Sequence, residues 1–427
     1  MSEPPAPKPR LSSRDWALIV LLAAVNFTHL LDFVIIMPLG KQLMHDLKIT
    51  PFQFSVLISV YALAAFVVGL LGAVVADRFD RKHLLLFAYG GFAVATLFCG
   101  LADSYEMFLV ARGCAGGFGG LAASVLLAII ADVFPEGKRG TAIGAVTSAF
   151  AVAVVLGIPL GLELSSAFGT GAPFLFLAAA SAVVWGVALA WMQSVAGHRT
   201  DERGGELKAL LAVAVEPTHL RSFAFMFFLV VGTFMVVPFI APFMQYNGEL
   251  SQREVMIVYS LAGVFTLIGM NVIGVMTDRV GARPVFVFAA SGSIVMTLLI
   301  THITPTTVVQ GVLLATGFMV MATGRIVPAQ AMMMAAARPA VRGRFSNLNN
   351  AVSHLATGLS ALLSGLMMTG GGFEETEPLV GYPRVGEVAA CFAVVAIGLA
   401  FALRPAARPT AAAEPDAAMS VPEPAVA

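Results

Sequence analysis

Two ionisable side chains, Asp32 and Arg112, lie within long apolar stretches of a chain in which charge is scarce. A carboxylate in such a place can titrate, and a nearby guanidinium favours its charged form, so the pair could carry a proton. Counting along each expected helix places them at depths that differ by about 6 Å, or one turn. A static ion pair, or a carboxylate that meets water at the outer rim, is the alternative.

Further polar side chains lie within the apolar stretches. Asn26, His29 and Asp32 are three residues apart along one helix face, and His29 could titrate or be a hydrogen-bonded packing residue. Arg325 is the other cation within a span, and no acid nearby is an obvious partner, so a substrate anion or backbone carbonyls are candidates.

Eight polar residues are candidates for lining a substrate cavity, with helix packing as the alternative for most of them. They are Asn26, Gln245, Asn271, Arg325, Gln330, Asn347, Asn350 and His354. Glu163 is a weaker candidate for proton coupling, because it falls near the outer end of its span and is more readily a rim residue.

The composition determines the class of protein that holds these residues. Of 427 residues, 58% are hydrophobic and 12% charged, whereas soluble domains carry about 25% charged residues. This excludes a soluble enzyme, a disordered chain and a nucleic-acid binder. The 3 cysteines are scattered, so neither a metal site nor a disulfide framework is expected. The chain is predicted to be an all-α polytopic membrane protein.

Apolar runs long enough to cross a bilayer predict twelve spans. They cover residues 16–38, 52–76, 84–102, 106–133, 141–163, 174–195, 222–246, 253–277, 285–301, 306–333, 345–370 and 387–403. The predicted units are an N-terminal tail (1–14), a six-helix bundle (15–195), a linker (196–221) with a short interfacial helix near Leu207–Val215, a second six-helix bundle (222–403) and a disordered tail (404–427).

Basic residues predict the orientation. Of the 25 Lys and Arg residues, nineteen fall in segments on the side of the N-terminus, four on the other side and two within spans. Because Lys and Arg accumulate in cytoplasmic loops, both termini are expected in the cytoplasm.

Two loop motifs recur along the chain. Asp77-Arg78 returns as Asp278-Arg279 at an offset of 201 residues, and the Arg-Gly pairs that begin at positions 139 and 342 are 203 apart. Recurrence at nearly one offset indicates a duplicated six-helix unit, an architecture typical of transporters.

These residues resemble the major facilitator superfamily, in particular its twelve-helix drug:proton antiporter and arabinose-efflux-like branch. The stretch from Gly274 to Arg283 fits the family's loop motif G-x-x-x-D-R-x-G-R-K well, whereas Ala73 and Asp80 replace both glycines in the first copy. Arg112 to Gly116 is similar to the family's R-x-x-x-G motif. Gly157, Pro159 and Gly161 are close to its G-x-P-x-G efflux signature.

The resemblance implies roles for these residues. The loop residues would form a cytoplasmic gate: Asp77, Arg78, Arg81, Asp278, Arg279 and Arg283. A solvated positive loop is the alternative. Gly116, Gly157, Pro159 and Gly161 would serve helix packing, with an ordinary helix kink as the alternative for span five.

The resulting prediction is a secondary transporter that exports a small organic solute across a bacterial inner membrane by alternating access, driven by protons through Asp32 and Arg112. No cofactor other than the coupling proton is expected, and no nucleic-acid partner. The protein is expected to contact lipid and to act as a monomer. A uniporter, a proton-coupled importer or a non-transporting sensor of the same fold are the alternatives. No catalytic motif with usable context indicates an enzyme.

Overall fold

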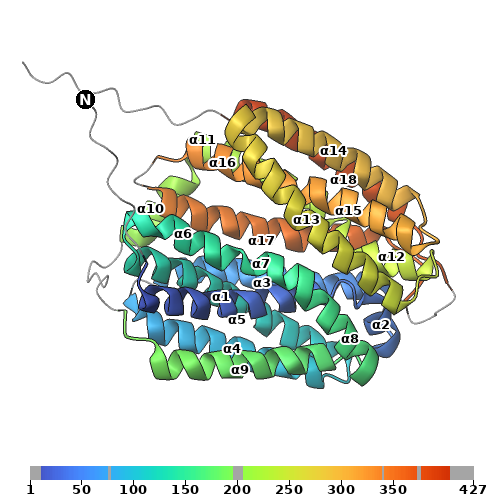
Figure 1. Ribbon diagram of the computed structural model, residues 1–427, viewed down its shortest axis with the longest axis horizontal. Coiled ribbons are helices and arrows are strands. Elements are labelled where there is room, and N and C mark those ends of the chain that lie inside the picture. The colour runs from blue at the N-terminus through green and yellow to red at the C-terminus, as the bar shows by residue number, and fades with distance from the viewer. Residues whose placement is uncertain (1–10, 76–77, 196–204, 339–340, 373–376, 404–427) are drawn as a thin grey trace, which may run out of the picture.

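The computed structural model describes residues 11–75, 78–195, 205–338, 341–372 and 377–403. Within these ranges the ordered elements are helices, with one isolated antiparallel bridge between Thr369 and Val380. The long helices lie side by side along the long axis of the molecule (Figure 1). Ten of the described helical segments are long and apolar enough to cross a membrane. The predicted all-α membrane fold is therefore confirmed.

The first half is built from helices that follow the first six predicted spans. They are α1 (Ser13–Ile35), α2 (Gly40–Asp46), α3 (Pro51–Val75), α4 (Arg81–Leu101), α5 (Tyr105–Val133), α6 (Glu136–Thr147), α7 (Ala149–Val152), the π-turn η2 (Ala153–Gly157), α8 (Ile158–Phe168) and α9 (Ala172–Trp191). The fifth span is thus one continuous path of short helices rather than a single rod.

The second half repeats this plan after a linker helix, α10 (Gly205–Ala214), which overlaps the expected interfacial helix. Its elements are α11 (Pro217–Phe234), the 3-10 turn η3 (Val237–Phe239), α12 (Ile240–Tyr246), α13 (Gln252–Val280), α14 (Ala282–His302), α15 (Val308–Gly324), α16 (Ile326–Ala336), α17 (Arg342–Met367) and α18 (Tyr382–Ala402). The eleventh span, α17, carries many polar residues and is less apolar than the other long helices.

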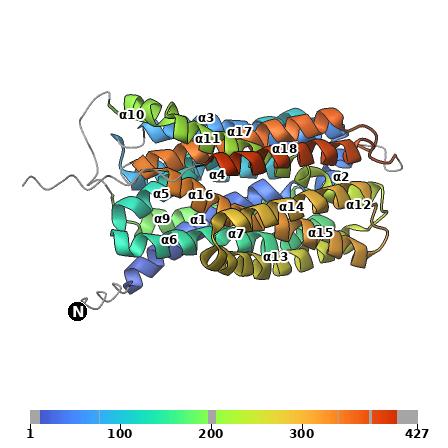
Figure 2. The ribbon, with the colours of Figure 1, turned by 90° about the horizontal axis from the view of Figure 1, so that it is seen from above.

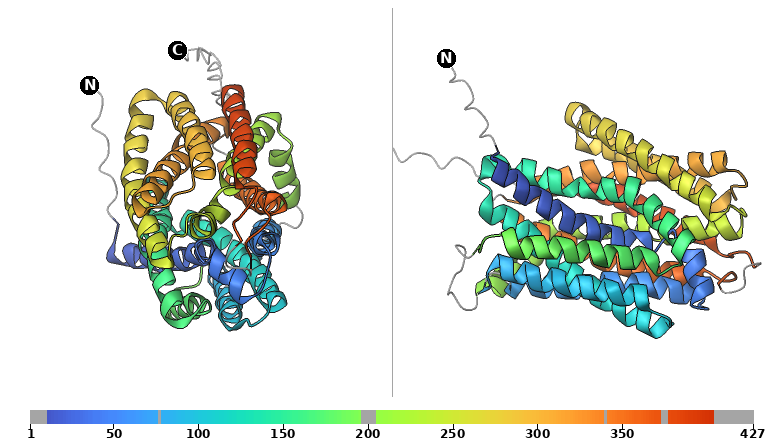
Figure 3. Two further views of the ribbon diagram at one scale, coloured as in Figure 1. Left: turned by 90° about the vertical axis from the view of Figure 1, so that its right-hand side faces the viewer. Right: turned by 60° about the horizontal axis from the view of Figure 1, so that its bottom comes forward.

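The two halves form separate helix groups that pack against each other mainly along α3 and α17. Viewed along the helices, the blue-to-green first half lies on one side and the yellow-to-red second half on the other (Figure 3). Helix α3 packs along α17, η2 and α8 pack on α13, and α2 meets α12. We call the end with α2 and α12 the far end, and the opposite end, with α10 and the start of α1, the near end (Figure 2).

The fifth span bends where the sequence placed glycine and proline. The π-turn η2 ends at Gly157, and Pro159 stands in the first turn of α8, where its missing N–H costs nothing. A Cβ on Gly157 would lie 2.6 Å from the Leu31 side chain, and one on Gly161 would lie 2.4 Å from that of Ile35. The bent span therefore packs closely against α1, the helix that carries Asp32.

The two copies of the loop motif differ for a structural reason. Gly281 ends α13 with a φ of 103°, which a residue with a side chain rarely adopts. At the same offset in the first half, Asp80 has a φ of −61° and caps α4 by accepting a hydrogen bond from the Lys82 backbone N–H. The departure of Asp80 from the motif exchanges a left-handed turn for a helix cap.

Candidate functional site

Asp32 and Arg112 form an ion pair in the core of the first half. Arg112 Nη1 donates to Asp32 Oδ2 at 2.9 Å, and both side chains are 0% exposed. The same Nη1 donates to the Asp32 backbone carbonyl at 3.2 Å, and Thr96 on α4 donates to Asp32 Oδ1 at 3.5 Å. The structure thus brings together the two residues that the sequence singled out, on α1 and α5.

Tyr61 on α3 connects this pair to His29. The Arg112 guanidinium carbon lies 4.2 Å from the centroid of the Tyr61 ring, a cation–π contact, and the Tyr61 hydroxyl lies 2.9 Å from His29 Nδ1. His29 is buried beside Gly119, where a Cβ would lie 2.5 Å from its Nδ1. His29, Tyr61, Arg112 and Asp32 therefore form one continuous polar chain inside an apolar bundle.

Asn347, Asn350 and His354 line a small cavity between the halves. Its volume is about 60 Å³, and its other walls are residues of α3 and α5, including Gly69, Gly120 and Ser124. Gly120 follows Gly119, the glycine that packs against His29. The polar stripe of α17 thus faces the first half next to the His29–Tyr61–Arg112–Asp32 chain.

Arg325 lies in the core of the second half at the junction of α15 and α16. It is 1% exposed and donates to Ser293 Oγ at 2.8 Å, to the Leu229 carbonyl at 3.2 Å and to the Thr233 hydroxyl. Among the residues that the structure describes, no carboxylate pairs with it. Its partners on α11 and α14 are all neutral oxygens.

The remaining predicted cavity residues and Glu163, the weaker candidate for proton coupling, are dispersed. Asn26 donates to the Val146 carbonyl at 3.0 Å and so joins α1 to α6, and Asn271 donates to the Leu267 carbonyl of its own helix at 2.8 Å. Gln330 and Glu163 are exposed, and Gln245 is buried in α12 near the far end. The structure does not bring these five side chains to one site.

The predicted gate residues lie at the near end, where their described contacts stay within one half. Arg81 pairs with Asp132 at 3.0 Å, and Arg283 donates to the Leu403 carbonyl at 2.8 Å. Arg78, Asp278 and Arg279 are exposed. Asp77 lies outside the described residues.

Sequence reasoning missed the contacts that join the halves at the far end. Gln42 Oε1 on α2 accepts from Ser165 Oγ at 2.6 Å and from Gln252 Nε2 on α13 at 3.2 Å. Lys41 Nζ donates to the Gln245 carbonyl at 3.3 Å and lies 4.8 Å from the Tyr246 ring centroid. The far end is therefore closed by a polar network across the two halves.

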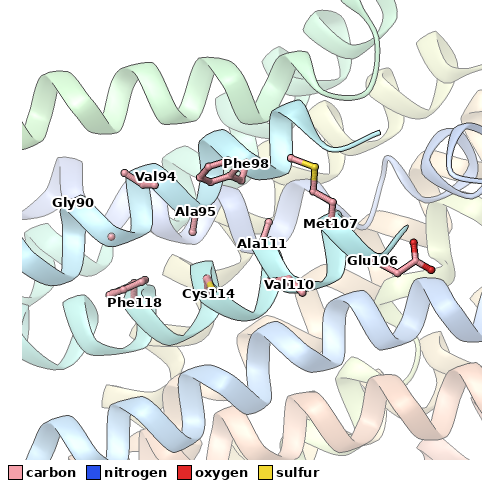
Figure 4. Close-up of a pocket in the computed structure, with 11 residues that line it drawn as sticks. Gly90, Val94, Ala95, Phe98, Glu106, Met107, Val110, Ala111, Cys114 and Phe118 are labelled. Carbon is pink, nitrogen blue, oxygen red and sulfur yellow. The ribbon is translucent and has the colours of Figure 1, made fainter. Parts of the chain in front are cut away.

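An apolar groove on the side of α5, the helix that carries Arg112, belongs to the first half alone. It measures about 710 Å³, and its walls are α4 and α5, with Val94, Phe98, Val110 and Cys114 along it and Glu106 at one mouth (Figure 4). Val94 and Val110 are among the exposed large hydrophobic residues, so the groove opens on the membrane-facing surface. A solute that moves between two halves would not be enclosed there.

Tyr61, Thr96, Thr233 and Ser293 were also missed by sequence reasoning. One signal was available for Thr233, because it follows Asp32 by 201 residues, the offset of the repeated Asp-Arg pair. For the other three, single hydroxyl groups in apolar spans carry no pattern that distinguishes a buried hydrogen-bond partner from a helix-packing residue.

Two similar six-helix bundles around buried charges, with contacts that close one end, define the class of a polytopic solute transporter. The sequence model of the Major Facilitator Superfamily matches residues 22–223 and again 222–425. The chain belongs to this family of secondary transporters and is not an enzyme.

Individual relatives agree with this assignment. The chain is 25% identical over 395 residues to the MFS-type transporter YbcL of Bacillus subtilis, covering 92% of this chain and 97% of the relative. It is 26% identical over 244 residues to the putative transporter AraJ of Escherichia coli, covering 57% and 61%. It is 24% identical over 213 residues to a probable sugar efflux transporter of Mannheimia succiniciproducens, covering 49% and 53%.

Solved structures confirm the fold. A bacterial homologue of the human lysosomal transporter Spinster, in its inward-facing and unoccupied conformation, matches with a TM-score of 0.71 at 18% identity, covering 92% of this chain and 98% of that one. A variant of the nucleoside transporter NupG matches with a TM-score of 0.70 at 15% identity, covering 90% and 99%.

Proposed function

We propose that this protein is a monomeric exporter of a small organic solute in the inner membrane of a bacterium, driven by protons that Asp32 carries. The observation that supports this most is the fully buried ion pair between Asp32 and Arg112. A carboxylate in the core of a membrane protein is costly to keep and is typically part of a proton or ion pathway.

The geometry allows the pair to alternate between two states. When Asp32 takes up a proton, its charge-assisted bond to Arg112 weakens, while the Asp32 backbone carbonyl still accepts from the same Nη1. The freed guanidinium keeps the Tyr61 ring beneath it. Protonation therefore loosens the link between α1 and α5 without leaving Arg112 entirely unsupported.

The bent fifth span can transmit this change to the second half. Gly157 packs on Leu31, the neighbour of Asp32, while a Cβ on Gly263 of α13 would lie 3.2 Å from the Val155 side chain. One short segment, η2, thus contacts both the helix of the titrating carboxylate and the opposite half. A shift of α1 on protonation would therefore be felt at the interface that must open and close.

Export, rather than uptake, is supported by the relatives and by the charge distribution. One relative is named a probable sugar efflux transporter. The near end holds Arg81, Lys138, Arg139 and Arg221, and basic residues of this kind mark the cytoplasmic side. The closed far end would then face the periplasm in the conformation described.

The test is solute exchange by the purified protein in proteoliposomes under an imposed pH gradient. We expect Asp32→Asn to abolish proton-driven exchange while the protein stays folded, because the neutral amide resembles the protonated carboxyl that the cycle itself contains. Arg112→Ala should fail in the same way. Glu163→Gln, which changes an exposed carboxylate, is the matched control and should transport normally.

Three outcomes would overturn the proposal. Undiminished coupled transport in Asp32→Asn would remove the proton-carrier role. Transport by the wild type that ignores the pH gradient would indicate a uniporter, and ligand binding without any flux would indicate a sensor.

A further inference from the structure

Arg325 is a buried cation without a counterion among the described residues. All the acceptors that it contacts are neutral, namely Ser293 Oγ, the Leu229 carbonyl and the Thr233 hydroxyl. Its Nε, also buried, has no hydrogen-bond partner in the described structure. An arginine side chain does not lose its proton, so the positive charge remains in the core of the bundle.

The first half shows how a buried arginine can be neutralised. Arg112 pairs with the Asp32 carboxylate, whereas Arg325 contacts Thr233, the residue 201 positions after Asp32. Arg325 follows Arg112 by 213 residues, so the two arginines do not occupy matching positions of the repeat. Each site also has a hydroxyl from the third helix of its half, Thr96 on α4 and Ser293 on α14. The arginine of the second half thus has hydroxyl partners where that of the first half has a carboxylate.

A buried arginine without a carboxylate is costly to keep unless an anion neutralises it. Removing an ion from water into a protein interior is expensive, and neutral hydrogen bonds offset only part of that cost. A charged acceptor forms shorter and stronger bonds to a guanidinium than a hydroxyl or a carbonyl does. Both arginines have buried nitrogens without a described partner, Nε of Arg325 and Nε and Nη2 of Arg112, but only Arg112 has a carboxylate among its described partners.

Thr233 is the least buried of the three residues that accept hydrogen bonds from Arg325. It is half-buried, whereas Leu229 and Ser293 are buried. Its neighbour Phe234 contacts Phe33 of the first half, with ring centroids 6.0 Å apart. Thr233 therefore lies close to the boundary between the halves.

From these contacts we infer that Arg325 is a binding site for a small monovalent anion, either chloride or the carboxylate group of an organic solute. The anion bonds to the Arg325 guanidinium, as the Asp32 carboxylate bonds to Arg112, with the Thr233 and Ser293 hydroxyls turned to donate to it. This inference goes beyond proton coupling and does not depend on it.

The experiment measures the thermal midpoint of the purified full-length protein in detergent as chloride or acetate replaces a bulky sulfonate at constant ionic strength. We expect each effective anion to raise the midpoint of the wild type by about 2–4 °C, because a ligand that binds only the folded state stabilises it. Chloride binding is measured in parallel by the broadening of the ³⁵Cl resonance.

The decisive variant is Thr233→Asp, which supplies a carboxylate beside Arg325. Its matched control is Thr233→Asn, because asparagine has the shape of aspartate but no charge. Thr233→Asp should lose the anion-dependent rise, whereas Thr233→Asn should retain it. Asp32→Asn provides the mirror test, since it leaves Arg112 without its carboxylate and should add a second anion-dependent rise.

The outcomes distinguish an inorganic anion from a solute carboxylate, and they also show when the inference is wrong. Stabilisation by both anions assigns an inorganic anion site, and stabilisation by acetate alone assigns the carboxylate of a solute. A wild-type response no larger than that of Thr233→Asp would overturn the inference, as would ³⁵Cl broadening and acetate stabilisation that persist in Arg325→Gln. None of these readouts measures flux, so failure here leaves the proton-coupling proposal to its own test.

Discussion

The two halves bury one arginine each, but they treat its charge differently. Arg112 is matched by Asp32 at 2.9 Å and covered by the Tyr61 ring, whereas Arg325 meets only hydroxyls and a carbonyl. Both side chains are almost completely buried. Each half thus buries a cation, at positions that the repeat does not match, and among the described residues only the cation of the first half is paired with a carboxylate.

The two halves therefore differ in whether their buried charge can change. A carboxylate that gains and loses a proton changes the charge of the first half, whereas the charge of the second half is fixed, because arginine stays protonated. In the described structure the titrating pair therefore belongs to one half. The contrast can be tested by altering the charges, the packing behind them and the contacts that hold the halves together.

The largest effect should follow from breaking the charge balance of the first half. Asp32→Leu leaves Arg112 buried without a carboxylate, with only the backbone carbonyl of residue 32 as an acceptor, and we expect a loss of about 3–5 kcal/mol in the free energy of unfolding. The double variant Asp32→Leu/Arg112→Leu should recover much of that loss, because no unpaired charge remains. Denaturant titration of the four proteins measures both terms.

The matching control is in the second half. Arg325→Leu removes a cation that has no carboxylate, so it should cost far less than Asp32→Leu. If the two single changes destabilise equally, the distinction between a compensated and an uncompensated arginine is wrong.

A smaller loss of stability should come from changing the glycines next to the two arginines, Gly116 one turn after Arg112 and Gly324 directly before Arg325. A Cβ on Gly116 would lie 2.2 Å from the Tyr61 backbone carbonyl, whereas one on Gly324 would lie 2.1 Å from the Cδ1 of Ile273, the mobile end of a side chain. Gly116→Ala must push α3 and α5 apart and should cost about 1–3 kcal/mol. Gly324→Ala should cost less, because the Ile273 side chain can rotate.

The control for both is Gly274→Ala, since a Cβ there meets nothing within 4 Å. It should be neutral or slightly stabilising, by up to about 1 kcal/mol, because alanine favours a helix. Thermal midpoints measured in one detergent compare the three. A cost of Gly324→Ala equal to that of Gly116→Ala would show that close backbone packing is not special to the first half.

The sequence was enough to predict the first-half pair but not the environment of Arg325. A carboxylate and a guanidinium stand out in apolar spans, and helix rise alone placed Asp32 and Arg112 within a turn of each other. The partners of Arg325 are hydroxyls and a carbonyl, which occur throughout the chain and carry no spacing that marks them. Side chains such as Gln330 and Asn271 were predicted to line a cavity, but helix rotation about its axis decides that, and a sequence without contacts leaves the rotation free.

The closure at the far end should weaken when Gln42 is changed. Gln42→Ala removes the acceptor that Ser165 and Gln252 share, and each lost hydrogen bond is worth about 1 kcal/mol. The halves should then separate more often at this end. Because the change lies outside both arginine sites, it tests whether the halves move independently of the charges.

The measurement is the distance between spin labels at Phe168 and Val309, two exposed residues at the far end of opposite halves. Cys114 and Cys391, which are also exposed, are first replaced by serine. We expect a new population of longer distances in Gln42→Ala. An unchanged distribution would show that apolar contacts between α3 and α17 are enough to hold this end closed.

The smallest effect concerns Asp80, where the halves again differ, because the matching position is Gly281. Burial acts to raise the pKa of Asp80, but hydrogen bonds from Ser194 and from the backbone of Lys82 and Val195 outweigh it and hold the pKa below its usual value. A folded pKa that is lowered adds stability above the unfolded pKa of about 4, and this stability is lost as the pH falls through the folded value. Asp80→Asn should therefore lower the free energy of unfolding slightly at neutral pH, by about 1 kcal/mol or less, and the difference from the wild type should vanish in acid. Gly281→Ala would also destabilise, through its positive φ, but equally at every pH, so a pH-independent difference for Asp80→Asn would mean that this residue acts through shape and not through charge.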